Sequence, residues 1–264
     1  MAAAEPTLAD MMDLSGRVAL LAGGHGPLAA PIAAALAELG CSIVLAARRT
    51  GPCEELADSL VTRLGATVDV RQLDVSDEAQ VDGLVAGVVS RHGSLDVVVN
   101  NAATFWAAPP EDVPLERGWQ RVVDVNLTGT FLVCRAAGRV MLAAGRGSII
   151  NMASSVAFIS FLPEVGSTLS YTVSKGAVVT LTRDLASQWA GRGVRVNAVA
   201  PGSMDSGLME SVPDERKQRM VDQIPAGRLG RPHELKGAVA FLASDLSSYV
   251  TGSVVRVDGG QTLL

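Results

Sequence analysis

Short apolar runs alternate with longer Ala- and Leu-rich segments, and this alternation restricts the fold more than any other feature of the chain. The runs expected to form strands cover residues 17–22, 42–47, 67–73, 95–99, 147–152, 194–199 and 253–257. The segments expected to form helices cover 27–39, 54–64, 78–91, 116–144, 171–191 and 232–243. Strands joined through helices pair in parallel, with helices on both faces of the sheet. The sequence therefore predicts an α/β fold with a doubly wound parallel sheet of about seven strands.

The composition agrees with one domain of this kind. Apolar residues make up 48% of the 264 residues and aromatic residues only 4%, so the core must consist of Ala, Val, Leu and Ile. These residues fill parallel sheets that are covered by helices. Because no linker or internal repeat is evident, we predict a single domain over residues 16–264. Residues 1–15 are expected to be a flexible leader, since termini are ordered only where something holds them.

Charge and cysteine content argue against several other classes of protein. A net charge of -5 without a basic stripe disfavours a nucleic-acid partner. The sequence shows neither an apolar run near the length of a membrane helix nor a basic, then apolar N-terminus, so we expect no membrane association and a cytoplasmic location. Cys41, Cys53 and Cys134 form no C-x-x-C pair and are interpreted as buried apolar residues rather than metal ligands.

Tyr171 and Lys175 are four residues apart in the predicted helix 171–191. Residues at this spacing share one face of a helix, and a cation beside a phenol lowers the phenol pKa from its ordinary value of about 10. Alone, such a pair is more typical of a solvated helix face than of a catalytic site. Serines after the run 147–152 place hydroxyl groups where parallel sheets bind ligands. The pair becomes a candidate active site only together with other motifs.

Several motifs occur in the order found in the short-chain dehydrogenase/reductase family, which the chain resembles from Leu14 to its C-terminus. They are Asp74-Val75, Asn-Asn-Ala-Ala at 100–103, Asn126, Ser154, Tyr171 with Lys175, Asn-Ala-Val-Ala-Pro-Gly at 197–202 and Val-Asp-Gly-Gly at 257–260. The resemblance implies a Rossmann-type fold and an oxidoreductase that transfers hydride between NADP(H) and a ketone or secondary alcohol. The resemblance extends to gluconate 5-dehydrogenase-like and 3-oxoacyl-reductase-like members, and the sequence does not choose between them.

The resemblance implies four catalytic residues. Tyr171 would act as the general acid/base, Lys175 would lower its pKa and hold the nicotinamide ribose, and Ser154 would bind the substrate oxygen. Asn126 would fix a water that relays protons from Lys175. Taken alone, Asn126 could instead cap a helix or bond the backbone, and Ser154 could satisfy its own turn.

The separation of Ser154 from Tyr171 exceeds the spacing usual in the family. An insertion around 162–168 would account for it and would lengthen the loop beside the substrate pocket. The longer spacing leaves Ser155 as an alternative to Ser154, although counting from Asn151 favours Ser154.

The first turn, Ala-Gly-Gly-His-Gly-Pro-Leu-Ala at 22–29, departs from the family pattern because Pro27 and Ala29 replace glycines. Pro27 fixes φ and donates no hydrogen bond to a pyrophosphate. We expect Gly26 to supply the backbone freedom and the Leu28 N–H to remain free for phosphate. The resemblance implies cofactor contacts from Gly23, His25, Gly26, Leu28, Arg48, Asp74, Val75, Asn101, Ala102, Tyr171, Lys175, Pro201, Gly202 and Met204.

Cofactor choice depends on Ala47 and Arg48 at the end of the second predicted strand. An NAD-preferring member would carry Asp near Ala47 for the adenosine ribose, whereas an arginine suits a 2′-phosphate. We therefore predict NADP(H), with NAD(H) as the alternative, although Arg48 could simply be solvated at a strand end. The altered turn also motivates a competing hypothesis, a nucleotide-binding sensor or scaffold without turnover. The complete set of four catalytic residues favours the enzyme.

Phe105, Trp106 and the segments 155–168 and 203–226 are expected to line or cover the pocket for a small ketone or alcohol. Phe105 and Trp106 could equally belong to the core. By resemblance, we expect a homotetramer or homodimer formed through helices 116–144 and 170–190 and the tail 260–264.

Overall fold

The computed structural model describes residues 5–160, 167–206 and 212–263, which contain one seven-stranded sheet. All neighbouring strands are parallel, in the order β3-β2-β1-β4-β5-β6-β7. The strands are β1 (Val18–Ala22), β2 (Ser42–Ala47), β3 (Val68–Gln72), β4 (Val97–Asn100), β5 (Gly147–Met152), β6 (Val194–Pro201) and β7 (Val254–Val257). The predicted fold class is confirmed.

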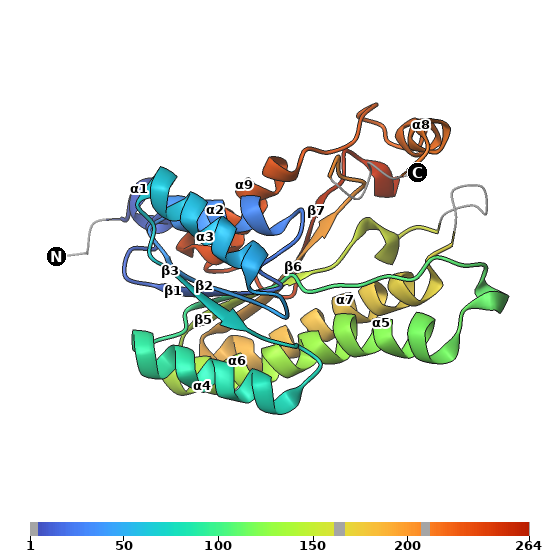
Figure 1. The fold of residues 1–264 in the computed structure, drawn as a ribbon. Helices are drawn as coiled ribbons and strands as arrows, with labels where there is room; N and C mark the ends of the chain where they lie inside the picture. Colours follow the sequence, from blue (N-terminus) through green and yellow to red (C-terminus); the bar gives the residue numbers. More distant parts are fainter. Residues whose placement is uncertain (1–4, 161–166, 207–211, 264) are drawn as a thin grey trace.

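Helices cover both faces of the sheet (Figure 1). The helices on one face are α2 (Ala29–Glu38), α3 (Gly51–Leu64) and α9 (Lys236–Ala243). Those on the other face are α4 (Glu78–His92), α6 (Gly129–Ala144) and α7 (Leu169–Trp189). Each layer forms its own cluster of buried Ala, Val, Leu and Ile side chains. The five inner strands, β2, β1, β4, β5 and β6, are buried on both faces, which explains why they appear in the sequence as continuous rather than alternating apolar runs.

The long helix predicted at 116–144 is helical throughout but irregular in its first half. It contains two π-helical segments, Leu115–Gln120 and Asp124–Thr128, with α5 (Arg121–Val123) between them. Such segments insert an extra residue in a turn and are frequent at functional sites. Asn126 lies in the second segment, so local geometry rather than helix periodicity decides where its side chain points.

By length and composition alone, Leu115–Ala144 could cross a membrane, yet half of its most apolar 18-residue window is buried inside the protein. Leu132, Val133 and Cys134 of this helix belong to the core under β4 and β5. Packing against the sheet therefore accounts for its apolar character.

Residues 5–15 differ from the flexible leader that we expected over residues 1–15, of which residues 1–4 lie outside the described residues. Thr7 caps α1 (Leu8–Met12) through a capping box with Asp10. Leu14 is fully buried, and its N–H donates to Leu39 O at 2.8 Å. The helix α8 (Asp214–Asp222) was not predicted, because its only apolar residues are Met220 and Val221 near its end and none of its residues is buried.

The strand order places β1 beside β4 at the centre of the sheet, where the chain changes from one face to the other. In doubly wound sheets, ligands bind at this switch point, outside the carboxyl ends of the strands. The turn after β1 and the segments after β4, β5 and β6 meet at this edge.

Candidate active site

Tyr171 and Lys175 lie on α7 beside the carboxyl end of β5. The Lys175 ammonium is buried and donates to Met152 O at 2.6 Å. The same nitrogen lies 5.6 Å from the centroid of the half-buried Tyr171 ring. The i, i+4 spacing thus brings the two groups together, and the contact with β5 fixes the ammonium under the ring.

Ser154 follows β5 and lies close enough to Tyr171 that its hydroxyl group acts to lower the pKa of that phenol. Ser154 also begins the short 3-10 turn Ser155–Ala157, where its Oγ accepts from Val156 N at 3.4 Å. Ser155 is almost fully buried and donates instead to Gln261 Oε1 at 3.3 Å. Of the two serines, the structure therefore brings Ser154 to Tyr171.

The proton affinities of this cluster differ from the sequence-based expectation. Burial raises the pKa of Tyr171, and the hydrogen bond with Ser154 opposes this shift without cancelling it. Burial also lowers the pKa of Lys175 to about 8. The lowered tyrosine pKa that we expected is wrong for the protein alone. Desolvation disfavours both charged forms, the phenolate of Tyr171 and the ammonium of Lys175.

Asn126 is completely buried and joins two segments beside this cluster. Its amide donates to Thr104 O at 2.8 Å and to Ser174 Oγ at 3.0 Å, and it accepts from Thr104 N at 2.8 Å. Ser174 in turn donates to Tyr171 O at 2.8 Å. Within the part of the chain that the structure describes, no hydrogen bond joins Asn126 directly to Lys175, so the relay role remains a prediction.

The turn after β1 is held tightly between two strands. Gly23 N and Gly24 N both donate to Ala46 O, at 2.8 and 3.0 Å. A Cβ on Gly23 would lie 2.3 Å from Ala102 N, so only glycine fits there. Asn101 Nδ2 donates to Gly23 O at 2.8 Å and ties the turn to the end of β4. Two of the expected cofactor residues thus hold the turn in place.

The second half of the turn is open, and it fits a dinucleotide phosphate. Gly26 has φ +108° and open space where a Cβ would stand. Leu28 begins α2 without a side-chain cap, and the first turn of α2 carries no acidic residue. A helix start of this kind can bind an anion through free N–H groups. Pro27 removes one N–H group, while Gly26 supplies the left-handed conformation that the family turn requires.

Arg48, Asp74 and Val75 follow β2 and β3 at the same edge. Arg48 is exposed, as a phosphate ligand must be. Burial acts to raise the pKa of Asp74, but hydrogen bonds from Ser76 and the charges of Arg121 and Arg48 outweigh it and lower the pKa. Asp74 is therefore a carboxylate at neutral pH.

The remaining expected cofactor residues surround the same edge. Pro201 ends β6, and Gly202 N donates to Val257 O at 3.0 Å. A Cβ on Gly202 would lie 2.7 Å from Asp258 Cα, so this position also requires glycine. Met204 is buried and pairs with Gly230 in an isolated bridge. The structure thus places Pro201, Gly202 and Met204 at the end of β6, near the serines after β5.

The described residues that we expected to line the substrate pocket are partly apolar and exposed. Phe105 is 53% exposed and is not part of the core. Trp106 is half-buried against Gly118, with the Arg117 guanidinium 5.9 Å from its ring centroid. Phe158, after the serines, lies under the Arg256 guanidinium at 4.4 Å. The insertion that we expected around 162–168 lies mostly outside the described residues.

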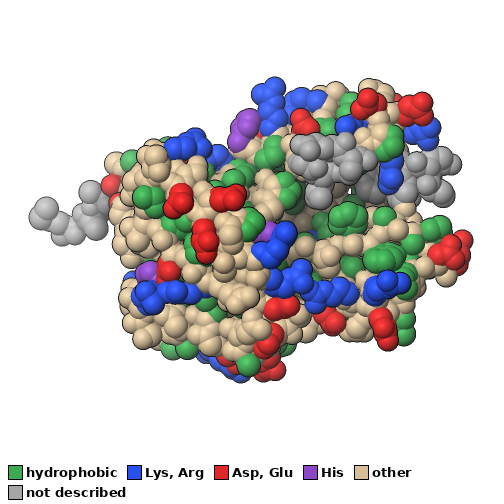
Figure 2. All heavy atoms as spheres, in the orientation of Figure 1, with side chains coloured by type: hydrophobic (Ala, Val, Ile, Leu, Met, Phe, Trp, Pro, Cys, Tyr) green, Lys and Arg blue, Asp and Glu red, His purple; other side chains and the backbone are tan. Residues whose placement is uncertain are grey.

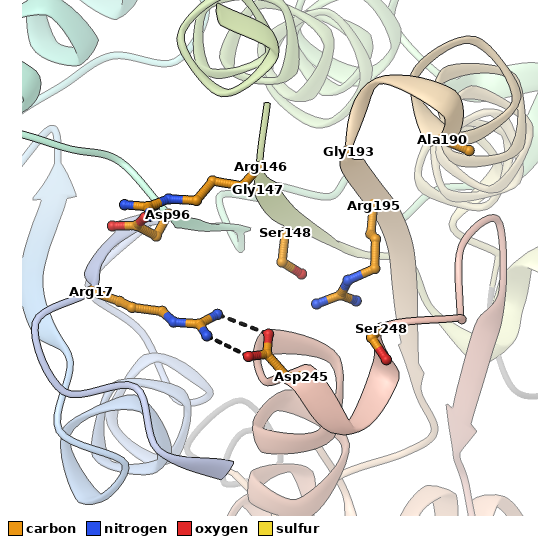
Figure 3. A pocket seen from close by; sticks show the side chains of 10 residues that line it. All are labelled: Arg17, Asp96, Arg146, Gly147, Ser148, Ala190, Gly193, Arg195, Asp245 and Ser248. Atoms are coloured by element: carbon orange, nitrogen blue, oxygen red, sulfur yellow. Dashed lines mark hydrogen bonds and ion pairs between the residues drawn. The ribbon is translucent and has the colours of Figure 1, made fainter. Parts of the chain in front are cut away.

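The opposite edge of the sheet carries a different cavity of about 250 Å³ (Figure 3). Arg17 pairs there with Asp245 through two hydrogen bonds of 3.1 and 2.6 Å. Arg146 pairs with the buried carboxylate of Asp96 at 3.1 Å. Arg195 donates to Ser247 and to backbone carbonyls. All three guanidinium groups thus have hydrogen-bond or ion-pair partners within the protein. We therefore interpret the groups around this cavity as a network that stabilises the fold.

Sequence reasoning missed Ser174, Thr104 and Gln261. Ser174 had a local signal, because it lies three residues after Tyr171 and directly before Lys175. Thr104 acts through its backbone, which no residue type reveals. Gln261 accepts hydrogen bonds from Ser155 Oγ at 3.3 Å and from Ser203 N at 3.1 Å. Both partners are far from Gln261 in the sequence, so no short motif could reveal these contacts.

Comparisons with known proteins agree with this geometry. The family model described as enoyl-(acyl carrier protein) reductase matches residues 25–262. The D-threitol dehydrogenase of Mycolicibacterium smegmatis is 37% identical over 251 residues, 95% of this chain and 94% of that protein. A short-chain type dehydrogenase/reductase from Mycobacterium marinum superposes with a TM-score of 0.93 at 36% identity, covering 98% of this chain and 100% of that chain. A gluconate 5-dehydrogenase from Burkholderia cenocepacia in complex with NADP and tartrate gives a TM-score of 0.89 at 34% identity, with 98% and 100% coverage.

Proposed function

Because the chain belongs to the short-chain dehydrogenase/reductase family, we propose that it transfers hydride between NADP(H) and a ketone or secondary alcohol, with Tyr171 as general acid/base. The observation that carries this proposal is the cluster of Ser154, Tyr171 and Lys175 beside the open turn after β1. A hydroxyl, a phenol and a buried ammonium are the groups that carbonyl reduction needs.

The nicotinamide ring would supply or accept the hydride, and the residues of the chain position the substrate and move the proton. Ser154 would donate a hydrogen bond to the substrate oxygen, where negative charge develops during reduction. Tyr171, whose raised pKa keeps the phenol protonated, would give its proton to that oxygen. In the oxidation direction Tyr171 must first lose its proton, and the charge of Lys175 beneath the ring would favour that step.

Asn126 would act as a positioning residue in this scheme. Its amide holds Thr104, after β4, and Ser174, which lies between Tyr171 and Lys175 on α7. We propose that this connection fixes the first turns of α7 against the segment after β4, and that a proton relay from Lys175 to solvent passes this point. Lys175 would hold the nicotinamide ribose in addition to its electrostatic role.

For the cofactor, we propose NADP(H) with Arg48 as the main contact of the 2′-phosphate. The gluconate 5-dehydrogenase of B. cenocepacia was solved with NADP, and a guanidinium pairs well with a phosphate. Asp74 and Val75 would flank the adenine, and Asn101 and Ala102 would lie along the nicotinamide ribose.

A fluorescence titration with NADPH and NADH tests the cofactor assignment directly. Arg48→Ala should weaken NADPH binding about tenfold or more, because hydrogen bonds to charged groups contribute about 1.5–3 kcal/mol, and should leave NADH nearly unchanged. Arg63→Ala, which removes an exposed arginine near the end of α3, is the matched control. An equal loss for both cofactors would contradict the phosphate contact. If neither cofactor binds at millimolar concentration, the enzyme proposal itself is wrong.

The substrate class is best tested with a panel of ketones and alcohols and both cofactors. Relatives named for D-threitol and gluconate motivate polyols and sugar acids, and 3-oxoacyl thioesters form the second group. We propose that the exposed ring of Phe105 and the Arg256–Phe158 stack border the substrate pocket. Turnover of any secondary alcohol or ketone in the panel supports the reaction class.

A non-catalytic sensor or scaffold is the second candidate, and the observation that favours it is Pro27 in the cofactor turn. A binder of this kind has no chemical need for Ser154, Tyr171 and Lys175 in contact. Cofactor binding without turnover of any member of the panel would favour this second candidate.

We further propose a homotetramer or homodimer in the cytoplasm, formed through α6, α7 and the C-terminal tail. Phe131 on α6, Val173 on α7 and Leu263 in the tail are exposed apolar side chains that an interface would bury. Size-exclusion chromatography with light scattering measures the oligomeric state.

A further inference from the structure

The side chain of Gln261, in the turn after β7, joins two segments that belong to the candidate active site. It is only 1% exposed, although the turn lies close to the end of the chain. Its Oε1 atom accepts from Ser203 N at 3.1 Å and from Ser155 Oγ at 3.3 Å, and its Nε2 atom donates to Ser203 Oγ at 3.2 Å. Figure 1 shows this red C-terminal turn beside the yellow-green segment that follows β5. One buried amide therefore holds the segment after β5 to the segment after β6.

The chemistry of the partners fixes which end of the amide faces them. A backbone N–H group can only donate, so the atom that faces Ser203 N must be the amide oxygen. Ser155 approaches the same oxygen and must therefore donate its proton. An amide oxygen has two lone pairs, and these two donors use both. An apolar side chain of the same length could not replace this contact.

The turn that carries Gln261 is itself closed by Asp258. The carboxylate accepts from Gly260 N at 3.0 Å and from Thr262 N and Oγ1 at 3.0 and 2.7 Å. The carbonyl of Asp258 accepts from Gln261 N at 3.1 Å. A Cβ on Gly202 would lie 3.0 Å from Gln261 Oε1, so the amide packs against the backbone of Gly202. The amide is thus held in place by its own turn and by the segment that it contacts.

Each of the two segments carries groups that we propose for the reaction. Ser155 directly follows Ser154 and is the first residue of the 3-10 turn that Ser154 caps. Ser203 directly follows Pro201 and Gly202, two of the expected cofactor residues at the end of β6. Hydride transfer requires a fixed separation between the substrate carbon and the nicotinamide, and an error of about 1 Å can cost about 10²-fold in rate. Gln261 is in contact with the support of each.

We propose that Gln261 is a positioning residue for hydride transfer, which holds Ser154, through Ser155, at a fixed place relative to the cofactor segment 201–203. The inference rests on the proposed function and adds to it a residue that is far from Ser154 in the sequence. The junction is neutral, because the side-chain partners of the amide are serines. The Lys and Arg side chains gathered in a band across the middle of one face (Figure 2) are not among these partners. An uncharged substitution at Gln261 therefore leaves no buried charge without its partner.

A single-turnover experiment separates a positioning role from a purely structural one. Enzyme in excess is mixed with NADPH and a saturating ketone, and the absorbance of NADPH is followed in time. The rate constant reports the geometry of hydride transfer, whereas the amplitude reports the fraction of folded, active protein. The probe is the panel member that the wild type reduces fastest, beginning with 5-keto-D-gluconate and acetoacetyl-CoA. The phase that slows when deuterium replaces both C4 hydrogens of NADPH is the hydride step.

Gln261→Met, which is uncharged and similar in length, should reduce this rate constant about tenfold, because the remaining contacts limit the displacement of Ser154, and should leave the amplitude nearly unchanged. Ser155→Ala should also reduce the rate constant, and the double variant should be no slower than Gln261→Met alone, because both changes remove one connection. Gln261→Glu keeps an oxygen acceptor of the same length and should recover most of the lost rate. Gln188→Met, which removes an exposed glutamine about 20 Å along α7 from Lys175, is the matched control.

An unchanged rate constant in Gln261→Met, whatever its amplitude, would overturn the inference, because Gln261 would then only stabilise the fold. Additive losses in Ser155→Ala and Gln261→Met would also overturn it, since the two residues would then act separately. If Gln261→Met does not fold, Gln261→Asn, whose amide is one methylene shorter, gives the same comparison. Absence of NADPH oxidation by the wild type with every panel member would instead refute the proposed function, so the two failures are distinguishable.

Discussion

The charged groups at the two ends of the parallel sheet differ in how completely the protein supplies them with hydrogen-bond and ion-pair partners. At the amino end, Arg17 pairs with Asp245, Arg146 pairs with Asp96, and Arg195 donates to a hydroxyl and backbone carbonyls (Figure 3). Every guanidinium in that cavity has a partner in the protein. A polar network that is satisfied in this way stabilises one structure and has little affinity left for a ligand.

At the carboxyl end, burial disfavours the charged forms of the ionisable groups. Lys175 is an ammonium buried with a single carbonyl, Tyr171 has a raised pKa, and the Nδ1 atom of His25 has no partner among the described residues. Such features cost stability and persist where function requires them. The amino end therefore has more charged groups, but their ion pairs and hydrogen bonds serve the stability of the fold. The carboxyl end has fewer charged groups with fewer partners, and these are the groups of the candidate active site.

The sharpest test of this comparison is Tyr171→Phe. Loss of a general acid/base typically costs about 10²- to 10⁴-fold in rate, so kcat should fall by that factor while the Kd for NADPH stays nearly constant. The chain has one other tyrosine, the fully exposed Tyr249, and Tyr249→Phe should leave kcat unchanged. Steady-state kinetics and cofactor titration measure both. Retained turnover in Tyr171→Phe would contradict the acid/base role.

The second test uses the buried charge of Lys175. Its pKa in the folded protein, about 8, is below its ordinary value of 10.5. Between these values the unfolded chain binds more protons, so this group makes the free energy of unfolding rise with pH. The total change corresponds to about 3 kcal/mol. The wild type should gain this amount over Lys175→Met between about pH 7.5 and pH 10.5 in urea unfolding experiments without cofactor.

The buried thiols make the comparison with a variant necessary. Burial raises the pKa of Cys41 and of Cys134 to about 12, so stability falls as the pH rises past the ordinary thiol value. Wild type and variant share this term, and it cancels in their difference. Lys217→Met, on the surface helix α8, is the control for loss of one lysine. A wild-type-minus-variant difference that does not change with pH would mean that Lys175 is not desolvated as described.

The sequence predicted the sheet well because its five inner strands are buried on both faces. Short, mostly apolar runs between helical segments identified all seven strands, and β2 and β5 have the predicted bounds. The π-helical turn that contains Asn126 could not be predicted. A π-helix and an α-helix differ in which backbone groups are hydrogen-bonded, and residue types alone do not reveal that difference. The highly charged helix α8 has only two apolar residues, too few to predict a helix from an apolar pattern.

The candidate site was predictable as a set of residues but less so in its energetics. Tyr171 and Lys175 are neighbours by helix geometry, so their contact follows from spacing alone. The pKa of Tyr171 depends on how much water the fold removes, and local sequence contains no measure of that. The choice of Ser154 over Ser155 depends on Gln261. This residue lies more than a hundred positions later in the sequence, and its side chain accepts a hydrogen bond from Ser155.

At the amino end, Arg195→Gln should affect stability and leave catalysis unchanged. The substitution removes hydrogen bonds to Ser247 Oγ and to the carbonyls of Leu242 and Ser244. Each unsatisfied buried group costs about 1–3 kcal/mol, and with partial rescue by water we expect a loss of about 2 kcal/mol, or about 4–8 °C in Tm. Arg192→Gln removes an exposed arginine nearby and is the control. A change in kcat/KM at equal folded fraction would show that the two ends are coupled.

The smallest expected effect is at the Arg17–Asp245 pair. Its two hydrogen bonds are short, but the side chains are 33% and 51% exposed, so water screens their attraction. A double-mutant cycle with Arg17→Gln and Asp245→Asn should give a coupling energy of about 0.5–1 kcal/mol that decreases with added salt. Cofactor affinity should be unchanged in all three variants. A coupling energy well above this range would mean that the cavity is drier than its exposure indicates. Both ends of the sheet would then contain buried charged groups. They would differ only in whether those groups have partners of opposite charge.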